Sequence, residues 1–142
     1  RSLLCLSSEV ETHTCEPDHF LAGIERLVEF HRATRPQNEV MHVKRHPYQL
    51  VDSNFSNRVI RVLRDRLGDG MVRELPPETA VEAIRWDGDR RLYLGLSSLA
   101  IYAHRQGATC YSFAKTIAAR DAHYRRRLQQ QPKAFLDAVE FL

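Results

Sequence analysis

Residues 53–70 read SNFSNRVIRVLRDRLGDG and form the most regular stretch of the chain. On a helical wheel, with about 100° between neighbours, its apolar side chains share one broad side. They are Phe55, Val59, Ile60, Val62, Leu63 and Leu67. Asp52 or Ser53 suits the start of a helix as its capping residue, and Gly68 suits its end. The stretch therefore predicts an amphipathic helix with one face in the core.

The opposite face of this helix carries amide and guanidinium groups. Its members are Asn54, Asn57, Arg58, Arg61 and Arg64. Arginine pairs with phosphates or with guanine edges, and asparagine pairs with adenine, so this face has the chemistry of a nucleic-acid contact. The alternative is an ordinary solvated face, which most amphipathic helices have.

Residues 53–75 also resemble the recognition helix and following segment of winged helix-turn-helix regulators of the LysR and MarR kind. In those families a serine opens the helix, branched apolar residues are buried, and Leu-Gly ends the helix before the wing. The matching residues here are Ser56, Ile60, Leu63, Leu67 and Gly68. The resemblance covers this segment only, and it implies that the arginine face contacts DNA.

Outward from this stretch, the chain reads as helices with a few short strands between them. Pro17 and Asp18 suit the first turn of a helix over residues 17–33. Its apolar positions Phe20, Ile24, Leu27, Val28 and His31 recur at helical spacing. Further helices are predicted over 78–86, 99–106, 113–131 and 133–142, and strands over 39–45, 71–75 and 90–96. Residues 1–16 suit either one strand or an irregular arm.

These elements predict an α+β fold that is mainly α. We expect a single compact domain over residues 1–142, with about five or six helices and a few short strands. The chain begins at Arg1 without a methionine, which indicates a processed product or an excised domain.

The predicted helix over residues 113–131 is the second basic element. Arg120, His123, Arg126 and Arg127 are assigned to its outer side. The further candidate nucleic-acid-binding residues are Arg120, Arg125, Arg126 and Arg127. Residues 99–130 also resemble a helix-turn-helix of the phage-repressor kind, in which a turn would fall near residues 119–121. One unbroken helix is the favoured interpretation.

Charge is distributed along the chain in blocks. Residues 31–66 carry eight Lys or Arg against three acids, and residues 91–133 carry eight against one. The segment between them and both ends of the chain are acidic. The overall net charge is only +3, so the separation into blocks is more informative than the total.

Composition excludes several classes of protein. Hydrophobic residues make up 43% and charged residues 27%, as in globular domains, and no apolar run approaches a membrane span. The three cysteines are an odd number in a chain that is long enough to fold without disulfides. We therefore expect an intracellular, reducing compartment and no membrane partner.

Histidines and cysteines supply the remaining candidate sites. His42 and His46 share a face on a strand, and a histidine pair suits acid–base chemistry. Cys110 is a candidate nucleophile. Cys15 and His19 have the spacing of half a zinc site, but no second close pair completes it, so no metal is predicted. The chain has no P-loop and no dinucleotide glycine pattern, so no cofactor is predicted.

Three classes of function stay open. The first is a nucleic-acid-binding domain, whose partner is DNA or RNA and whose two basic blocks meet on one surface. The second is a protein-interaction module or assembly subunit. The third is a small enzyme that uses His42, His46 or Cys110, and it is the least favoured.

Overall fold

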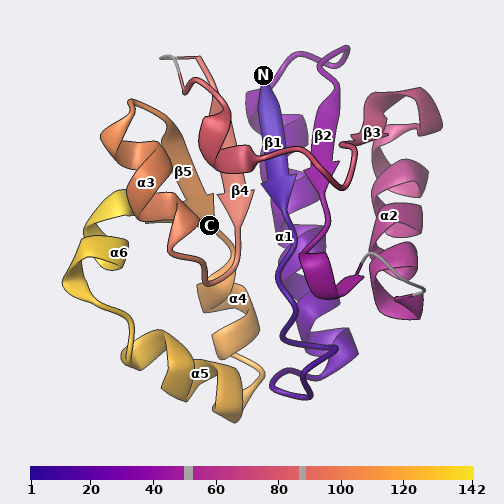
Figure 1. Ribbon diagram of the computed structural model, residues 1–142. Coiled ribbons are helices and arrows are strands. Elements are labelled where there is room, and N and C mark those ends of the chain that lie inside the picture. Colours follow the sequence, from indigo (N-terminus) through magenta and orange to yellow (C-terminus); the bar gives the residue numbers. More distant parts are fainter. Residues whose placement is uncertain (50–52, 87–88) are drawn as a thin grey trace.

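A parallel sheet forms the centre of the molecule (Figure 1). The computed structural model describes residues 1–49, 53–86 and 89–142, and within these residues the sheet has six strands in the order β3-β2-β1-β4-β5-β6. The strands are β1 (Ser2–Cys5), β2 (Met41–Lys44), β3 (Val72–Glu74), β4 (Arg91–Leu94), β5 (Thr109–Ser112) and β6 (Val139–Phe141). All five pairings between neighbouring strands are parallel.

This architecture corrects the predicted fold class. The chain is an α/β protein with a Rossmann-like arrangement, so the prediction of a mainly α, α+β domain was wrong. The strands are three or four residues long, and the central ones are buried on both faces. Such strands lack the alternation of apolar and polar residues that marks a half-exposed strand, so their pattern is weak.

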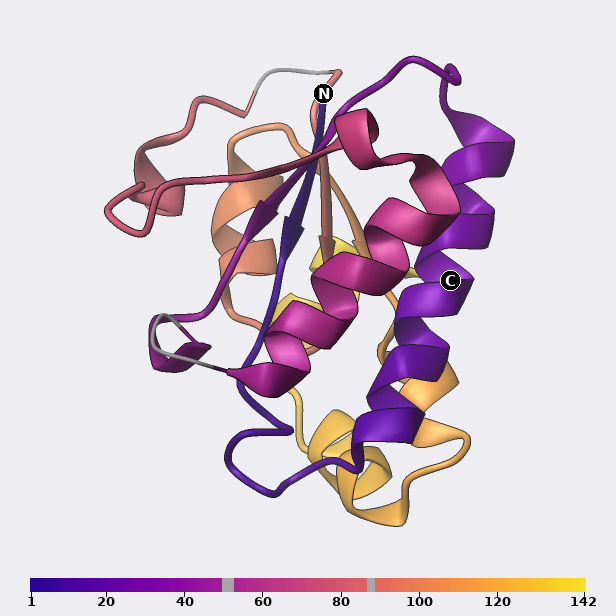
Figure 2. The same ribbon diagram turned by 90° about the vertical axis from the view of Figure 1, so that its right-hand side faces the viewer.

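Helices cover both faces of the sheet. They are α1 (Pro17–Thr34), α2 (Asn54–Leu67), α3 (Leu99–Arg105), α4 (Ala114–Ala118), α5 (Ala122–Gln129) and α6 (Lys133–Ala138). Figure 2 shows the sheet from its edge, with α1 and α2 on one side and α3 on the other. Helix α1 packs against α2 and α4, whereas α3 packs against α6 and the short 3-10 helix η3 (Val81–Ala83).

Helices α1 and α2 confirm the predictions made for them. Pro17 begins α1, and the apolar positions predicted for its buried face are all buried. Ser53 caps α2 by accepting a hydrogen bond from the Ser56 backbone N–H at 3.0 Å. Gly68 ends the helix with φ of 104°, a conformation that favours glycine. Asp52, the alternative cap, lies outside the described residues.

Three other predicted helices differ from the structure. The predicted helix over 113–131 is interrupted at Asp121, which is extended and caps α5 by accepting from the Tyr124 N–H at 2.9 Å. The break falls where the helix-turn-helix interpretation placed a turn. The predicted helix over 133–142 ends early because its last residues pair with β5 as β6. Residues 78–86 form only η3.

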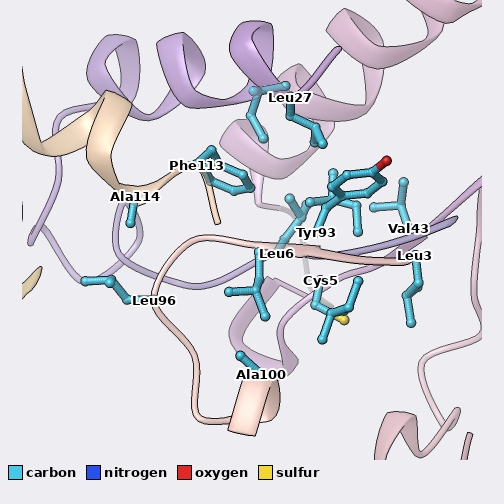
Figure 3. Packing of buried hydrophobic residues seen from close by; sticks show 14 of the residues in the cluster. Leu3, Cys5, Leu6, Leu27, Val43, Tyr93, Leu96, Ala100, Phe113 and Ala114 are labelled. Carbon is cyan, nitrogen blue, oxygen red and sulfur yellow. The ribbon is translucent and has the colours of Figure 1, made fainter. Parts of the chain in front are cut away.

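The core lies on both faces of the sheet (Figure 3). Leu4 is in register with Val43 and with Tyr93, so these side chains share the face that α1 covers. Figure 3 shows Leu27 of α1 and Phe113 on that side of the strands, and Ala100 of α3 on the other.

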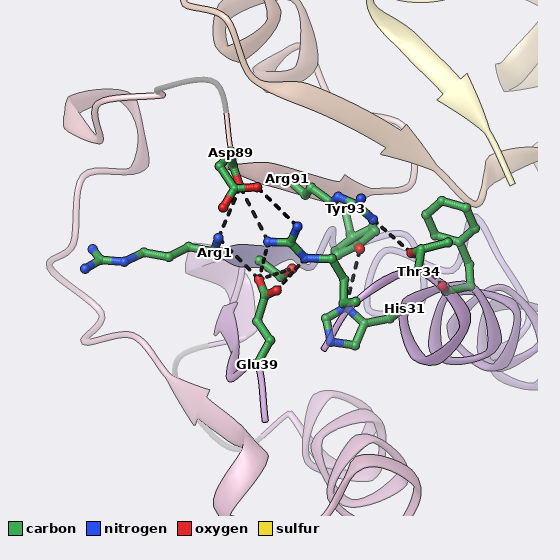
Figure 4. A network of polar contacts seen from close by, with 10 residues as sticks. Arg1, His31, Thr34, Glu39, Asp89, Arg91 and Tyr93 are labelled. Atoms are coloured by element: carbon green, nitrogen blue, oxygen red, sulfur yellow. Dashed lines mark hydrogen bonds and ion pairs between the residues drawn. The ribbon is translucent and has the colours of Figure 1, made fainter. Parts of the chain in front are cut away.

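The amino edge of the sheet is held together by a network of charged side chains (Figure 4). Arg35 pairs with Glu39 and, at 3.3 Å, with Asp89, and the amino group of Arg1 lies 3.2 Å from Glu39. Burial acts to raise the pKa of Glu39, but hydrogen bonds from Arg35, Ser2 and the amino terminus lower it to about 2. Glu39 is therefore ionised and fully paired.

Among the described residues, none of the helices combines the length and the apolar character needed to cross a bilayer.

Candidate functional site

The order of the strands reverses between β1 and β4. The chain runs outward from β1 through β2 to β3, crosses back to β4, and then runs outward again through β5 to β6. In doubly wound sheets, ligands bind outside the carboxyl ends of the strands at this reversal. We call this region, bounded by the loops after β1 and β4, the switch point. It lies at the lower edge of the sheet in Figure 1, where the strand arrows end.

Residues 6–16, which join β1 to α1, form one wall of the switch point. The carbonyl group of Glu9 accepts hydrogen bonds from the backbone N–H groups of Thr14 and Cys15, at 2.8 and 3.1 Å. The carboxylate of Glu11 accepts from Gln49 at 2.9 Å and from Ser53 at 2.7 Å. These bonds tie the loop to the residues that follow β2 and hold its side chains in place.

Buried polar atoms without a hydrogen-bond partner gather at the switch point. Among the described residues they include Ser7 Oγ, Glu9 Oε2 and Tyr124 Oη, although the Ser7 hydroxyl lies close enough to Glu9, and the Leu96 backbone close enough to Tyr124, to offset part of the rise that burial causes in the pKa values of those two groups. A Cβ on Gly95 would lie 2.6 Å from Tyr124 Oη and 3.7 Å from Ser7 Oγ, so both hydroxyls lie beside the residue that follows β4. Each buried polar atom without a partner costs about 1–3 kcal/mol.

Glu9 is the most deeply buried acid at the switch point, with 3% of its surface exposed. Burial raises the pKa of its carboxyl group, and the neighbouring Ser7 hydroxyl, Arg127 and His46 offset part of this effect. Arg127 lies 3.8 Å from the carboxylate. A carboxyl group in this setting can accept hydrogen bonds from hydroxyl groups of a ligand.

His46 lies beyond the carboxyl end of β2 and extends the site toward that strand. The backbone N–H of Tyr48 donates to its Nδ1 at 3.2 Å. In the neutral ring this bond leaves the proton on Nε2, which then acts as a hydrogen-bond donor. The imidazole also packs on the Tyr48 ring, with the ring centres 5.2 Å apart. His46 can therefore offer a positioned N–H group to an anion.

A cavity of about 490 Å³ lies at the carboxyl ends of β2 and β3. Its polar lining is formed by Lys44, Arg45, Gln49, Asn57 and Glu74. Arg45 donates to Glu74 at 2.7 Å and to Asn57 at 2.7 Å, and Lys44 donates to the carbonyl groups of Pro76 and Pro77. The cavity thus presents both donors and acceptors.

The two strands at the switch point continue into the same tripeptide. Leu6-Ser7-Ser8 follows β1, and Leu96-Ser97-Ser98 follows Gly95 after β4. Ser97 Oγ accepts a hydrogen bond from the Leu99 backbone N–H at 3.2 Å, and Ser98 is exposed. Four hydroxyl groups therefore border the switch point, two from each strand.

The amino end of α1 is already occupied by a side chain of this protein. Asp121 accepts from the Glu16 N–H at 3.2 Å and from His19 at 3.0 Å, and it also caps α5. Burial acts to raise the pKa of Asp121, but these partners lower it to about 2. In dinucleotide-binding domains a pyrophosphate lies at this helix end, so a ligand here must bind elsewhere at the switch point.

The arginine face predicted on residues 53–70 lies on the outer side of α2, where it meets acidic partners. Arg58 pairs with Asp18 at 3.1 Å, and Arg64 pairs with Asp69 at 3.5 Å. Asn54 and Arg61 are exposed, whereas Asn57 is hydrogen-bonded to Arg45.

The second set of predicted arginines is divided between the segment after α4 and α5. Arg120, Arg125 and Arg126 are exposed, and Arg125 donates to the Ala118 carbonyl at 2.9 Å. Arg127 is turned toward the switch point, where it donates to Thr14 at 3.1 Å. The set therefore does not form one continuous outer face.

A shallow depression of about 500 Å³ brings part of the two basic sets together. Arg58 and Arg120 line it from either side of α1. The α1 residues between them include the acids Asp18, Glu25 and Glu29. The shared surface is therefore mixed in charge.

The other predicted sites do not assemble. His42 lies within β2 and His46 beyond its end, and only His46 faces the switch point. Burial raises the pKa of the Cys110 thiol to about 11, which leaves it protonated at neutral pH and a poor nucleophile. Within residues 1–49, 53–86 and 89–142, no three His, Cys, Asp or Glu side chains gather as they would around a metal.

Sequence reasoning identified His46 and Arg127 among the residues at the switch point, but not the others. Ser7, Glu9, Ser97 and Tyr124 belong to no familiar motif. The sequence does repeat Leu-Ser-Ser after two short apolar runs. This repeat indicates a shared site only if both runs are strands of one parallel sheet.

Comparison with known proteins identified no relative of this chain. No family model, no curated protein and no solved structure matches the chain. The candidate site rests on the strand order and on the side chains at the switch point.

Proposed function

We propose that this domain binds a nucleotide at the carboxyl edge of its sheet. The observation that carries the proposal is the gathering of buried, unpartnered polar groups at the point where the strand order reverses. Strand order β3-β2-β1-β4-β5-β6 is that of doubly wound domains that bind nucleotides at this point. Because one fold can host many functions, the chemistry of the site must come from its side chains.

The side chains suit the parts of a nucleotide. Nε2 of His46 and the serine hydroxyls after β1 and β4 are donors for phosphate oxygens. The cavity beyond β2 and β3 is adjacent, and its Arg45, Asn57 and Glu74 present donors and acceptors to a base and a sugar. Arg127 adds positive charge near the loop after β1.

Titration calorimetry with the four ribonucleoside 5′-monophosphates and diphosphates tests the proposal. We expect at least one of them to bind, and His46→Ala to weaken its binding by roughly tenfold, which corresponds to about 1.4 kcal/mol. His104→Ala is the matched control, because this exposed histidine lies in the last turn of α3, whereas the first turn of α3 is the one next to the switch point. Failure of all eight compounds to bind at millimolar concentrations would overturn the proposal.

Nucleic-acid binding is a second candidate, favoured by the depression that Arg58 and Arg120 share. Arg61 is exposed on α2 and Arg126 is exposed on α5, so phosphate contacts from both elements are sterically accessible. The acids of α1 between the two sets oppose this function. DNA and RNA are the partners it implies, in a reducing compartment inside the cell.

A salt series with labelled duplex DNA, single-stranded DNA and RNA tests this second candidate. Binding should weaken steeply as salt rises, because phosphate contacts release counterions. Replacing Arg61 and Arg64 together with alanine should weaken binding while leaving the fold intact. Absence of binding at low salt would exclude this function and leave the nucleotide proposal untouched.

A further inference from the structure

One face of the sheet is thinly covered over β1 and β2. The crossover from β3 to β4 runs in front of these strands in Figure 1, and its described part up to Trp86 contains η3 and no α-helix. A parallel sheet normally has a helix at this position, because both faces must be covered. The missing helix leaves a cavity between the crossover and the strands.

This cavity has a volume of about 280 Å³ and mainly apolar walls. We call it the Trp86 pocket. It is lined by Arg1, Ser2, Leu3, His42, Leu75, Thr79, Ile84, Trp86 and Arg90. Concave, mostly apolar cavities with a few polar groups are the usual form of small-molecule sites.

The polar groups of the pocket specify what could bind there. Trp86 is only 3% exposed, and its indole N–H has no hydrogen-bond partner within the described part of the chain. Indole N–H groups are donors only, so this one requires an acceptor. Burial lowers the pKa of His42, which keeps its ring neutral at pH 7. The pocket therefore combines one buried donor with mainly apolar walls, and Arg1 and Arg90 also belong to its lining.

We propose that the Trp86 pocket is a second binding site, for a small aromatic molecule that carries one hydrogen-bond acceptor. The apolar walls from Leu3, Leu75 and Ile84 would hold the ring, and the acceptor would bond to the Trp86 N–H. The pocket lies over the first half of β1 and β2, whereas the nucleotide site lies beyond their carboxyl ends. The two cavities are neighbours, since Leu75 lines both of them.

The experiment uses the fact that Trp86 is the single tryptophan of the chain. Its indole N–H gives one resolved signal in a proton–nitrogen correlation spectrum, which reports on the pocket directly. Acetophenone is the probe, and ethylbenzene is its control, because the two have nearly the same shape and only acetophenone carries an acceptor. We expect acetophenone to shift the indole signal saturably and to bind roughly five- to tenfold more tightly than ethylbenzene.

Two variants test whether the probe binds in the Trp86 pocket. Thr79→Phe fills the pocket from its lining and should abolish the shift, whereas Glu78→Phe adds the same ring at the neighbouring position, outside the lining. Absence of a saturable shift in the unaltered protein overturns the proposal, and this result does not depend on any variant folding. Equal binding of the two probes, or an unchanged shift in Thr79→Phe, also overturns it.

Discussion

The two edges of the sheet differ in how far their polar side chains are paired with one another. At the amino edge, Arg35, Glu39, Asp89 and the amino group of Arg1 form ion pairs with one another, and Nε of Arg35 lies beside Glu39 without a well-directed hydrogen bond. At the carboxyl edge, polar atoms of Ser7, Glu9 and Tyr124 are buried and lack a hydrogen-bond partner within the described residues.

The pKa values follow the same division. Glu39 has a pKa of about 2, because the hydrogen bonds from its partners outweigh its burial. Burial raises the pKa of Glu9, because its partners do not compensate. One edge therefore stabilises the fold, and the other retains unsatisfied groups that a ligand can use. Unfavourable local energetics are typical of functional sites.

The largest effect should come from opening the amino-edge network. Glu39→Ala leaves Arg35, whose side chain is only 9% exposed, without its main partner. Removal of one member of a buried pair costs about 3–5 kcal/mol, so we expect a loss near the lower end of that range in urea unfolding. Lys133→Ala breaks an exposed pair and should change stability by less than about 0.5 kcal/mol. Similar losses in both variants would contradict the assignment of a stabilising role to this edge.

The second largest effect should come from acid, which protonates the paired carboxylates and lowers the free energy of unfolding. Glu39 and Asp121 have folded-state pKa values of about 2, below their ordinary values of 4.5 and 3.8. Their stabilisation is present above the ordinary pKa values and is lost as the pH falls toward 2, on the order of 2 to 3 kcal/mol for each group. Glu39→Gln should flatten this part of the profile of unfolding free energy against pH.

Glu9 should respond to pH in the opposite direction. Because its pKa is raised in the folded state, its contribution is most favourable at low pH and is lost as the pH rises through the folded-state value. Glu9→Gln should therefore increase the unfolding free energy at pH 7. A decrease would mean that the carboxylate is well paired and would remove the contrast between the two edges.

A smaller effect is expected from crowding the switch point. A Cβ on Gly95 would approach Tyr124 Oη to 2.6 Å, so Gly95→Ala should destabilise the fold by about 1–3 kcal/mol. Tyr124→Phe removes that oxygen and should recover at least half of the loss in the double variant. Gly70→Ala is the control, since its Cβ meets nothing within 4 Å. Additive effects of the two substitutions would exclude this contact.

The smallest effect compares one substitution at two fully buried tyrosines. The hydroxyl of Tyr93 is hydrogen-bonded to Nδ1 of His31 at 3.3 Å, so Tyr93→Phe should lose about 1 kcal/mol. Tyr124→Phe removes an unpartnered hydroxyl and should leave stability unchanged or slightly higher. Thermal unfolding of both variants measures the difference, and equal losses would show that Tyr124 is already satisfied.

Local patterns in the sequence predicted the long helices well. The buried face of α1, the Ser53 cap of α2 and the glycine stop at Gly68 depend on residues within a few positions of one another. Such features are visible along the chain, because helical hydrogen bonds connect near neighbours. Residues 113–131 were predicted as one helix because a local pattern does not record distant contacts. The break at Asp121 depends in part on such a contact, since Asp121 accepts a hydrogen bond from the backbone N–H of the distant Glu16.

The sheet and the site depended on contacts that no local pattern records. Strands β5 and β6 are four and three residues long, and they are strands because β5 pairs with β4 and β6 pairs with β5. The switch point brings Ser7 and Tyr124 together beside Gly95 from three separate parts of the chain.

The sequence by itself therefore determined the two long helices α1 and α2, the residues at which they begin and end, and the distribution of charge, since these depend on neighbouring residues. Only the tertiary structure decided which strands pair, and with them the edge of the sheet where unpartnered polar groups meet. The physical reason is that parallel pairing joins segments distant in sequence, with no short turn to mark them.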